Sequence, residues 1–240
     1  MADEMTLSER LASIRVRIAQ AAARAGRTAA SVELVAVTKT LSTQTVRAAY
    51  DLGLRRFGEN RVQEAREKIP ALGLAGSHWE LIGHLQTNKA GPAVELFERI
   101  QSVDSVRLAE ALSVRARASE REMLILLEVN IAGEASKSGF APAELSGAAM
   151  AIERLPGLRI QGLMTVAPIA TEPELVRPVF RQTRELLASL REGGAGREGW
   201  DQLSMGMSDD FEVAIEEGAT LIRVGRALFG ERATPPNRVQ

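Results

Sequence analysis

The sequence contains no cysteine, few aromatic residues and no long apolar run, and each of these absences excludes a class of protein. Without cysteine there is no disulfide, no thiolate metal site and no cysteine nucleophile. Aromatic residues make up 4% of the chain, too few to predict a platform on which nucleic-acid bases stack. The longest purely aliphatic stretch, Met123 to Leu127, is far shorter than the roughly 20 residues of a membrane span.

An excess of charge of one sign is also missing. Lys and Arg total 30 and Asp and Glu total 31, so the net charge is −1. A chain so close to neutral is not expected to bind a phosphate backbone through bulk electrostatics. The N-terminus reads Met-Ala-Asp-Glu and does not show the basic and then apolar layout of a secretory signal. We therefore expect a cytoplasmic globular protein that binds neither nucleic acid nor membrane.

Short apolar segments alternate with stretches of helical periodicity along most of the chain. Eight such segments are expected to be strands: 33–38, 56–60, 79–84, 99–103, 123–129, 158–164, 202–205 and 220–224. Continuous apolar strands are buried on both faces, as in a parallel sheet covered by helices. Eight units of about 25 residues each predict an α/β fold, a (β/α)8 TIM-type barrel.

We expect residues 1–240 to form one domain, because no linker is visible. An extra N-terminal helix is expected over about 5–26 and the barrel over about 33–230. The alternative fold is an open doubly wound sheet. That fold usually has a glycine-rich turn after its first strand, where this chain has Thr38-Lys39-Thr40.

A long helix of mixed charge is predicted from Glu174 to Arg191, with Leu175, Val179, Leu186 and Leu190 turned inward. We see no exposed apolar stripe or block of charge that would mark a partner-binding module, which is one alternative function. For the same reason we expect a monomer.

The carboxyl ends of the strands are where a parallel barrel carries its function, and Lys39 follows the first of them. A lysine sheltered at the barrel mouth loses hydration, which lowers its pKa. The neutral amine can then attack a carbonyl and form a Schiff base. The alternative is an ordinary solvated lysine at a strand end.

The loops after the last two strands have features of a phosphate site, which barrels often hold at this position. The hydroxyl of Ser204 and the amide of Gly206 are placed to contact an anion. Gly225 allows close backbone approach, and the short helix after it presents free N–H groups. Ser208 and Asp209 are expected to be N-caps of a helix that begins near residue 210. The alternative is a pair of ordinary turns, but a strand-end lysine with this phosphate loop describes a pyridoxal phosphate site.

Eight segments carry a family resemblance, in order along the chain: 34–40, 57–64, 79–89, 100–105, 129–139, 162–168, 203–211 and 222–230. The chain resembles the pyridoxal 5′-phosphate homeostasis proteins, whose barrel is like the N-terminal domain of alanine racemase. The resemblance implies pyridoxal phosphate as cofactor, bound as a Schiff base to Lys39. It implies that Asn60 lies beside the cofactor and that Arg223 faces the pyridine nitrogen. Ser204, Gly225 and Arg226 are implied to hold the phosphate, the last two through backbone N–H groups.

Arg226 departs from the family pattern, which often has a small hydroxylated residue there, so only a side-chain contact is in doubt. Strand-end positions and the resemblance together give the residues expected at the cofactor site, with none of them assigned to catalysis: Lys39, Asn60, His84, Met164, Ser204, Arg223, Gly225 and Arg226.

The resemblance implies an intracellular carrier or buffer of pyridoxal phosphate rather than an enzyme. An arginine at the pyridine nitrogen disfavours its protonation, so the ring stabilises a carbanion poorly. The alternative is an amino-acid racemase, which needs a base on each face of the substrate. The sole tyrosine, Tyr50, is expected on the outside of the barrel, and the chain ends too soon after the eighth unit to add a second domain.

A metal hydrolase is a further alternative, but His78 and His84 are expected to lie too far apart to share an ion, so we expect no metal site. His84 is expected to be a cofactor neighbour or a hydrogen-bonded strand-end histidine. Pyridoxal-phosphate-dependent apoenzymes are the expected partners. Lys137, in a loop at the barrel mouth, is expected either to assist cofactor hand-off or to be a solvated lysine.

Overall fold

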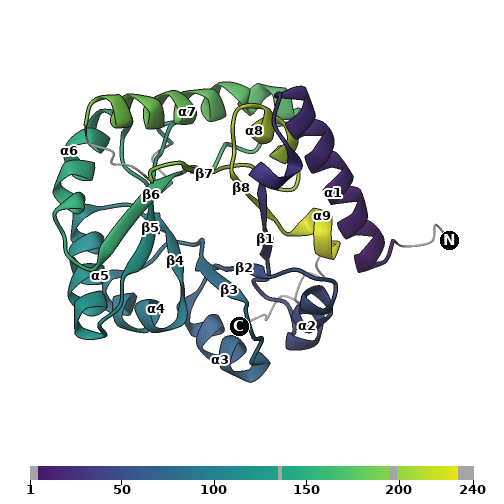
Figure 1. Ribbon diagram of the computed structural model, residues 1–240, viewed down its shortest axis with the longest axis horizontal. Helices are drawn as coiled ribbons and strands as arrows, with labels where there is room; N and C mark the ends of the chain where they lie inside the picture. The colour runs from purple at the N-terminus through teal and green to yellow at the C-terminus, as the bar shows by residue number, and fades with distance from the viewer. Residues whose placement is uncertain (1–4, 135–136, 195–198, 232–240) are drawn as a thin grey trace, which may run out of the picture.

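In the computed structural model, which describes residues 5–134, 137–194 and 199–231, eight parallel strands close into a barrel with helices around it (Figure 1). The strands follow one another around the barrel in chain order: β1 (Glu33–Val37), β2 (Arg56–Glu59), β3 (His78–Leu81), β4 (Arg99–Val103), β5 (Met123–Glu128), β6 (Leu158–Met164), β7 (Gln202–Ser204) and β8 (Leu221–Val224). The predicted barrel is therefore confirmed, and the open sheet is excluded because β8 pairs with β1.

The helices cover the outside of the barrel and alternate with the strands, as predicted: α1 (Leu7–Arg24), α2 (Thr43–Asp51), α3 (Val62–Leu72), α4 (Ala90–Leu96), α5 (Val106–Ala118), α6 (Pro142–Glu153), α7 (Arg177–Glu192), α8 (Phe211–Glu216) and α9 (Arg226–Phe229). Short 3-10 turns lie at Ala29–Ser31, Thr87–Lys89 and Pro173–Val176. No helix in the described parts of the chain is long and apolar enough to cross a membrane.

The extra helix α1 packs beside α8 and α9 (Figure 1). Thr6 caps its start, since its hydroxyl accepts the amide of Glu9 while the Glu9 carboxylate accepts the amide of Thr6. On its flank, Arg10 Nε donates to the carbonyl of Leu228 at 3.0 Å. The helix thus supports the short helix α9 from outside.

The inward face predicted for the long helix is confirmed at three of its four residues. Leu190 is buried, and Val179 and Leu186 are partly buried and pack against the core. The prediction was wrong for Leu175, which is 63% exposed. Leu175 lies in the 3-10 turn that precedes α7, because the α-helix begins at Arg177 rather than at residue 174.

The interior of the barrel is lined by every second residue of each strand. Val35, Leu126, Met164 and Leu221 form a cluster separate from the main core. Because β1 and β5 lie on opposite sides of the barrel, these contacts cross its lumen. Gly58 faces the same space, since a Cβ there would lie 3.0 Å from Val35 Cγ1. Residues two or four positions further along these strands therefore lie on the lumen side, toward the open mouth.

Candidate functional site at the mouth of the barrel

Lys39 lies in the turn after β1, four residues beyond the lumen-facing Val35. The residue before it, Thr38, is fully buried and faces away from the lumen, because its hydroxyl donates to Glu59 Oε1 at 2.7 Å. The residue after it, Thr40, has a φ of 63°. With Thr38 turned outward, the alternation of β1 directs Lys39 toward the lumen.

Arg223, two residues beyond Leu221 on β8, is only 4% exposed. Its guanidinium donates to Ser204 Oγ at 2.6 Å and to the carbonyl of Thr165 at 2.7 Å. Within the described residues no carboxylate forms an ion pair with it, and burial lowers its pKa to about 10 while nearby Glu128 raises it. It remains a cation at neutral pH, held by neutral groups.

A chain of hydrogen bonds continues from Arg223 across the lumen. The Ser204 hydroxyl donates to Gln101 Oε1 at 2.5 Å, and the Gln101 amide nitrogen donates to the Glu80 carboxylate. Glu80 is fully buried and also accepts from Arg56 at 2.7 Å. The Ser204 hydroxyl thus donates to Gln101 and accepts from Arg223, so both hydrogen bonds are made to side chains of the lumen.

Ser208, rather than Ser204, faces the short helix after β8. Its hydroxyl accepts the amide of Ala227 at 3.1 Å. Ser208 and Asp209 were expected to cap α8, and this expectation was wrong: the N-cap is Asp210, and the Asp209 carboxylate pairs with Arg226. A β-carbon on the glycine at position 206, whose φ is 93°, would lie 2.6 Å from the side chain of residue 214, so this turn requires glycine.

Gly225 is the N-cap of α9, whose first amides have no acceptor within the helix. The Arg226 side chain points away from this end, since its guanidinium pairs with Asp209 and with Glu231, the latter at 3.3 Å. Only the backbone of Arg226 is thus available to an anion here, as the departure from the family pattern had suggested.

Glu128 ends β5 two residues beyond Leu126, and sequence reasoning missed it. It is 9% exposed, and its carboxyl makes no hydrogen bond or ion pair with the described residues. Burial foremost raises its pKa to about 7, with Asp104 adding to the rise and Arg223 opposing it. It lines a cavity of about 140 Å³ together with Asn130, Lys137, Ser138 and Val166. The signal in the sequence was a carboxylate at the end of the most apolar strand.

Asn60 and Met164 also lie at the lumen side. Met164 is fully buried in the lumen cluster and pairs in register with both Glu128 and Ser204. Asn60 is two residues beyond Gly58, and the next loop packs closely on its backbone: a β-carbon at residue 83 would lie 2.4 Å from the Asn60 carbonyl. Both are thus placed where strand-end reasoning expected them.

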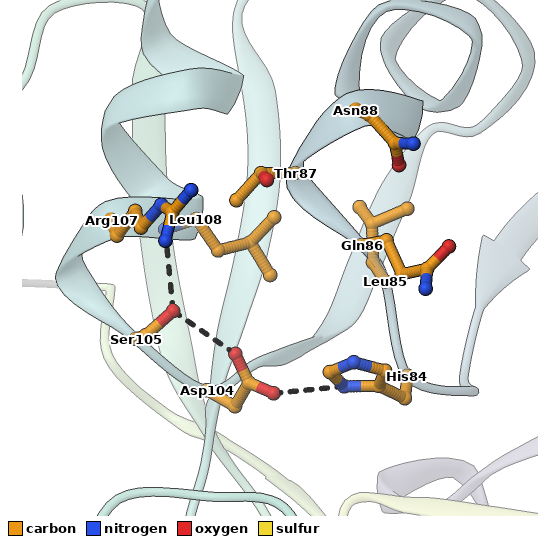
Figure 2. A pocket seen from close by; sticks show the side chains of 9 residues that line it. All are labelled: His84, Leu85, Gln86, Thr87, Asn88, Asp104, Ser105, Arg107 and Leu108. Atoms are coloured by element: carbon orange, nitrogen blue, oxygen red, sulfur yellow. Dashed lines mark hydrogen bonds and ion pairs between the residues drawn. The ribbon is translucent and has the colours of Figure 1, made fainter.

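His84 lies further out, on the rim between the loops after β3 and β4. Its Nδ1 is 3.0 Å from Asp104 Oδ2 and 3.3 Å from Ser138 Oγ. Figure 2 shows Asp104 between His84 and Ser105. These three residues help to line a second pocket, of about 500 Å³. His84 is therefore hydrogen-bonded in the loop after β3, and its place beside the cofactor stays a prediction.

Lys137 reaches back over the mouth. Its ammonium donates to Glu134 Oε1 at 2.8 Å and approaches the carbonyl of Val166 at 3.4 Å. Tyr50, in contrast, lies outside the barrel as predicted, near the amino end of β2. Its hydroxyl donates to the carbonyl of Ala75 at 2.7 Å, so it cannot serve as a second base at the mouth.

Comparison with known proteins identifies the family of this chain. Residues 10–233 match the family model of the alanine racemase N-terminal domain. A pyridoxal phosphate homeostasis protein of Pseudomonas aeruginosa is 44% identical over 227 residues, which cover 95% of this chain and 96% of that protein. The chain belongs to the pyridoxal phosphate homeostasis protein family.

Other members of the family are similarly close. The pyridoxal phosphate homeostasis protein of Aquifex aeolicus is 42% identical over 229 residues, covering 95% of this chain and 99% of that one. The structure of PipY of Synechococcus elongatus with pyridoxal phosphate bound is 40% identical, with a TM-score of 0.83 over 94% of this chain and all of that one. An alanine racemase of Clostridium difficile is 12% identical with a TM-score of 0.74 and shares the fold.

Proposed function

We propose that this chain binds pyridoxal phosphate at the mouth of the barrel, linked to Lys39, and serves as a carrier or buffer of the coenzyme. The observation that carries the proposal is the neighbourhood of β1 and β8. Val35 pairs in register with Arg223, and Lys39 follows Val35 on the same side of β1. The bound coenzyme in PipY, a relative of the same fold, supports the assignment.

The side chains at the mouth fit this coenzyme. The start of α9, with the Ser208 hydroxyl beside it, presents donors for a phosphate. Met164 provides an apolar wall, and Asn60 adds a polar group on the other side of the mouth. Arg223 is a buried cation without an ion pair in the described residues, so it suits a neutral ring nitrogen that accepts a hydrogen bond.

When bound, pyridoxal phosphate supplies an aldehyde that condenses reversibly with a primary amine and releases water. Lys39 provides that amine within a fixed turn. Ser208 and the backbone of Gly225 and Arg226 orient the phosphate, and the Arg226 side chain stays outside. Ser204 accepts a hydrogen bond from Arg223, and its assignment to the phosphate by the resemblance stays a prediction.

We further propose that catalysis is minor. Arg223 keeps a positive charge where protonation of the ring would be needed, which disfavours carbanion chemistry. A racemase also needs a second base opposite the lysine, and Tyr50 lies on the outside of the barrel. Glu128, whose raised pKa is about 7, is a candidate for a proton-transferring group. A slow side activity on amino acids is therefore the second function to test.

The test combines spectroscopy with mapping. The purified protein, supplied with pyridoxal phosphate, is expected to turn yellow, and borohydride reduction followed by peptide mapping is expected to label Lys39. Assays for racemisation and transamination on the same sample should give only trace rates. A colourless protein, or an adduct elsewhere with Lys39 unmodified, would overturn the binding proposal. Rapid turnover of an amino acid would overturn the carrier role.

Delivery to apoenzymes belongs to the same proposal. A second amine can displace Lys39, and Lys137 stands over the mouth with Glu134 and Val166. Lys137→Ala is expected to change the rate at which coenzyme is transferred to an apoenzyme, and an unchanged rate would leave Lys137 without that role. A monomer is expected, which sedimentation of the loaded protein would test.

A further inference from the structure

Lys68 occupies the buried side of α3, a position that lysine seldom takes without partners. All three of its ammonium donors are used. They go to the carbonyl of Thr38 at 2.8 Å, to Glu59 Oε1 at 2.7 Å and to Glu64 Oε1 at 2.6 Å. These groups lie between the barrel wall and α3, outside the lumen, so the coenzyme site does not include them. Yet they contact the turn that carries Lys39.

The same two carboxylates bind that turn on both sides of Lys39. Glu59 Oε1 accepts from the Thr38 hydroxyl at 2.7 Å, and Glu64 Oε1 accepts from the Thr40 amide at 2.5 Å. Thr40 has a φ of 63°, a conformation that a β-branched residue rarely adopts and that persists only where its surroundings impose it. The residues before and after Lys39 are thus held by groups on the outer side of the barrel wall.

We propose that Glu59, Glu64 and Lys68 are positioning residues for Lys39, holding its turn so that the amine reaches the aldehyde of the coenzyme. The inference rests on the proposed function and adds residues that the lumen-side site does not contain. Their contribution concerns the covalent step, because none of them lies on the side of the strands where the coenzyme is placed. Binding of the phosphate and ring, at β7 and β8, should not depend on them.

The inference is tested by measuring covalent attachment to Lys39 separately from non-covalent binding of the phosphate and ring. Attachment is the first-order rate of spectral change at saturating pyridoxal phosphate. Binding without attachment is the affinity for pyridoxine 5′-phosphate, which has an alcohol in place of the aldehyde. The variants are Glu64→Ala, which removes the acceptor of the Thr40 amide, and Glu64→Gln, which keeps an acceptor oxygen. Glu67→Ala, on the exposed side of the same helix, is the matched control.

We expect Glu64→Ala to attach the coenzyme about tenfold more slowly, with affinity for pyridoxine 5′-phosphate within about twofold of the parent. Glu64→Gln should recover most of the rate, and Glu67→Ala should match the parent. An unchanged attachment rate in Glu64→Ala, or an equal loss of attachment and analogue affinity, would overturn the inference. If the parent protein itself binds neither compound, the proposed function fails and the inference fails with it.

Discussion

Two polar clusters lie on opposite sides of the barrel wall and are built on different principles. The outer cluster consists of Glu59, Glu64 and Lys68, and the inner cluster consists of Glu80, Gln101, Ser204 and Arg223. In the outer cluster the cation contacts two carboxylates directly. In the inner cluster the cation at the mouth contacts only a hydroxyl and a carbonyl, and the carboxylate lies two hydrogen bonds further away.

The difference indicates which cation is paired within the protein and which can act directly on a ligand. A buried charge that is fully paired needs nothing further, and its loss leaves its partners unsatisfied. A buried charge that contacts only neutral groups is not neutralised within the protein, so it can interact electrostatically with a molecule that enters the lumen. Glu128 repeats the inner pattern, because its buried carboxyl has no partner in the described part of the chain.

The largest effect on binding is expected from Lys39→Met. Without the amine no borohydride-stable adduct should form, and the affinity for pyridoxal phosphate should fall by more than about a hundredfold. The free energy of unfolding of the ligand-free protein should change by less than about 1 kcal/mol, because Lys39 is partly exposed. Mass spectrometry of the reduced protein and urea unfolding measure the two. A reduced adduct at another lysine would contradict the assignment.

The same substitution at the outer lysine is expected to have a large effect on stability. Lys68→Met leaves Glu59 buried without its cation, and we expect a loss of about 3–5 kcal/mol in the free energy of unfolding. Lys89→Met is the control, because Lys89 is partly exposed whereas Lys68 is buried. Urea unfolding of the three proteins gives the comparison. A loss no larger than that of the control would remove the distinction between the two clusters.

Glu128→Gln is expected to stabilise the protein in a pH-dependent way. The ordinary pKa of 4.5 applies to the unfolded chain and a pKa of about 7 to the folded one, so the folded state binds the proton more tightly. Below pH 4.5 both states are protonated, and the native carboxyl carries no penalty. As pH rises through 7 the folded state loses about 3 kcal/mol relative to the unfolded state.

The variant lacks this penalty, so its advantage should be absent near pH 4, grow between pH 4.5 and 7, and level off above that. Thermal or urea unfolding of both proteins at pH 4, 6 and 8 measures it. Glu110→Gln, on the exposed side of α5, is the control. An equal difference at every pH would show that Glu128 is not an unpaired buried carboxyl.

The sequence predicted the barrel well because its signals are local and repeated. Each strand is a continuous apolar run followed by a helical period, and closure was inferred from their number. The strand-end rule also placed Lys39, Asn60 and Arg223 at the mouth. What it could not supply is the direction of a side chain once a strand has ended. Ser204 and Ser208 are four residues apart in one motif, and only the fold shows which one faces Arg223.

The outer cluster was also beyond prediction, although its parts were visible. Glu64 and Lys68 have the i,i+4 spacing of a helical ion pair, which is usually a solvated surface pair. Here the apolar stripe of α3 carries Lys68 inward, against the turn after β1. The hydrogen bond from Lys68 to the Thr38 carbonyl joins residues 30 positions apart, and no local sequence pattern specifies it.

The smallest effect, and the sharpest separation within the site, concerns the two serines. If Ser208 faces the phosphate, Ser208→Ala should weaken binding of pyridoxal phosphate about fivefold and leave binding of pyridoxal, which lacks the phosphate, unchanged. Ser204→Ala should weaken both compounds equally, because its hydroxyl acts through Arg223 and the ring. Titration by absorbance gives the four affinities, and Ser113→Ala, which removes a buried hydrogen bond to the Pro156 carbonyl, is the control. Should Ser204→Ala alone abolish the preference for the phosphorylated compound, the phosphate contact belongs to Ser204 and the inner cluster rearranges when the coenzyme binds.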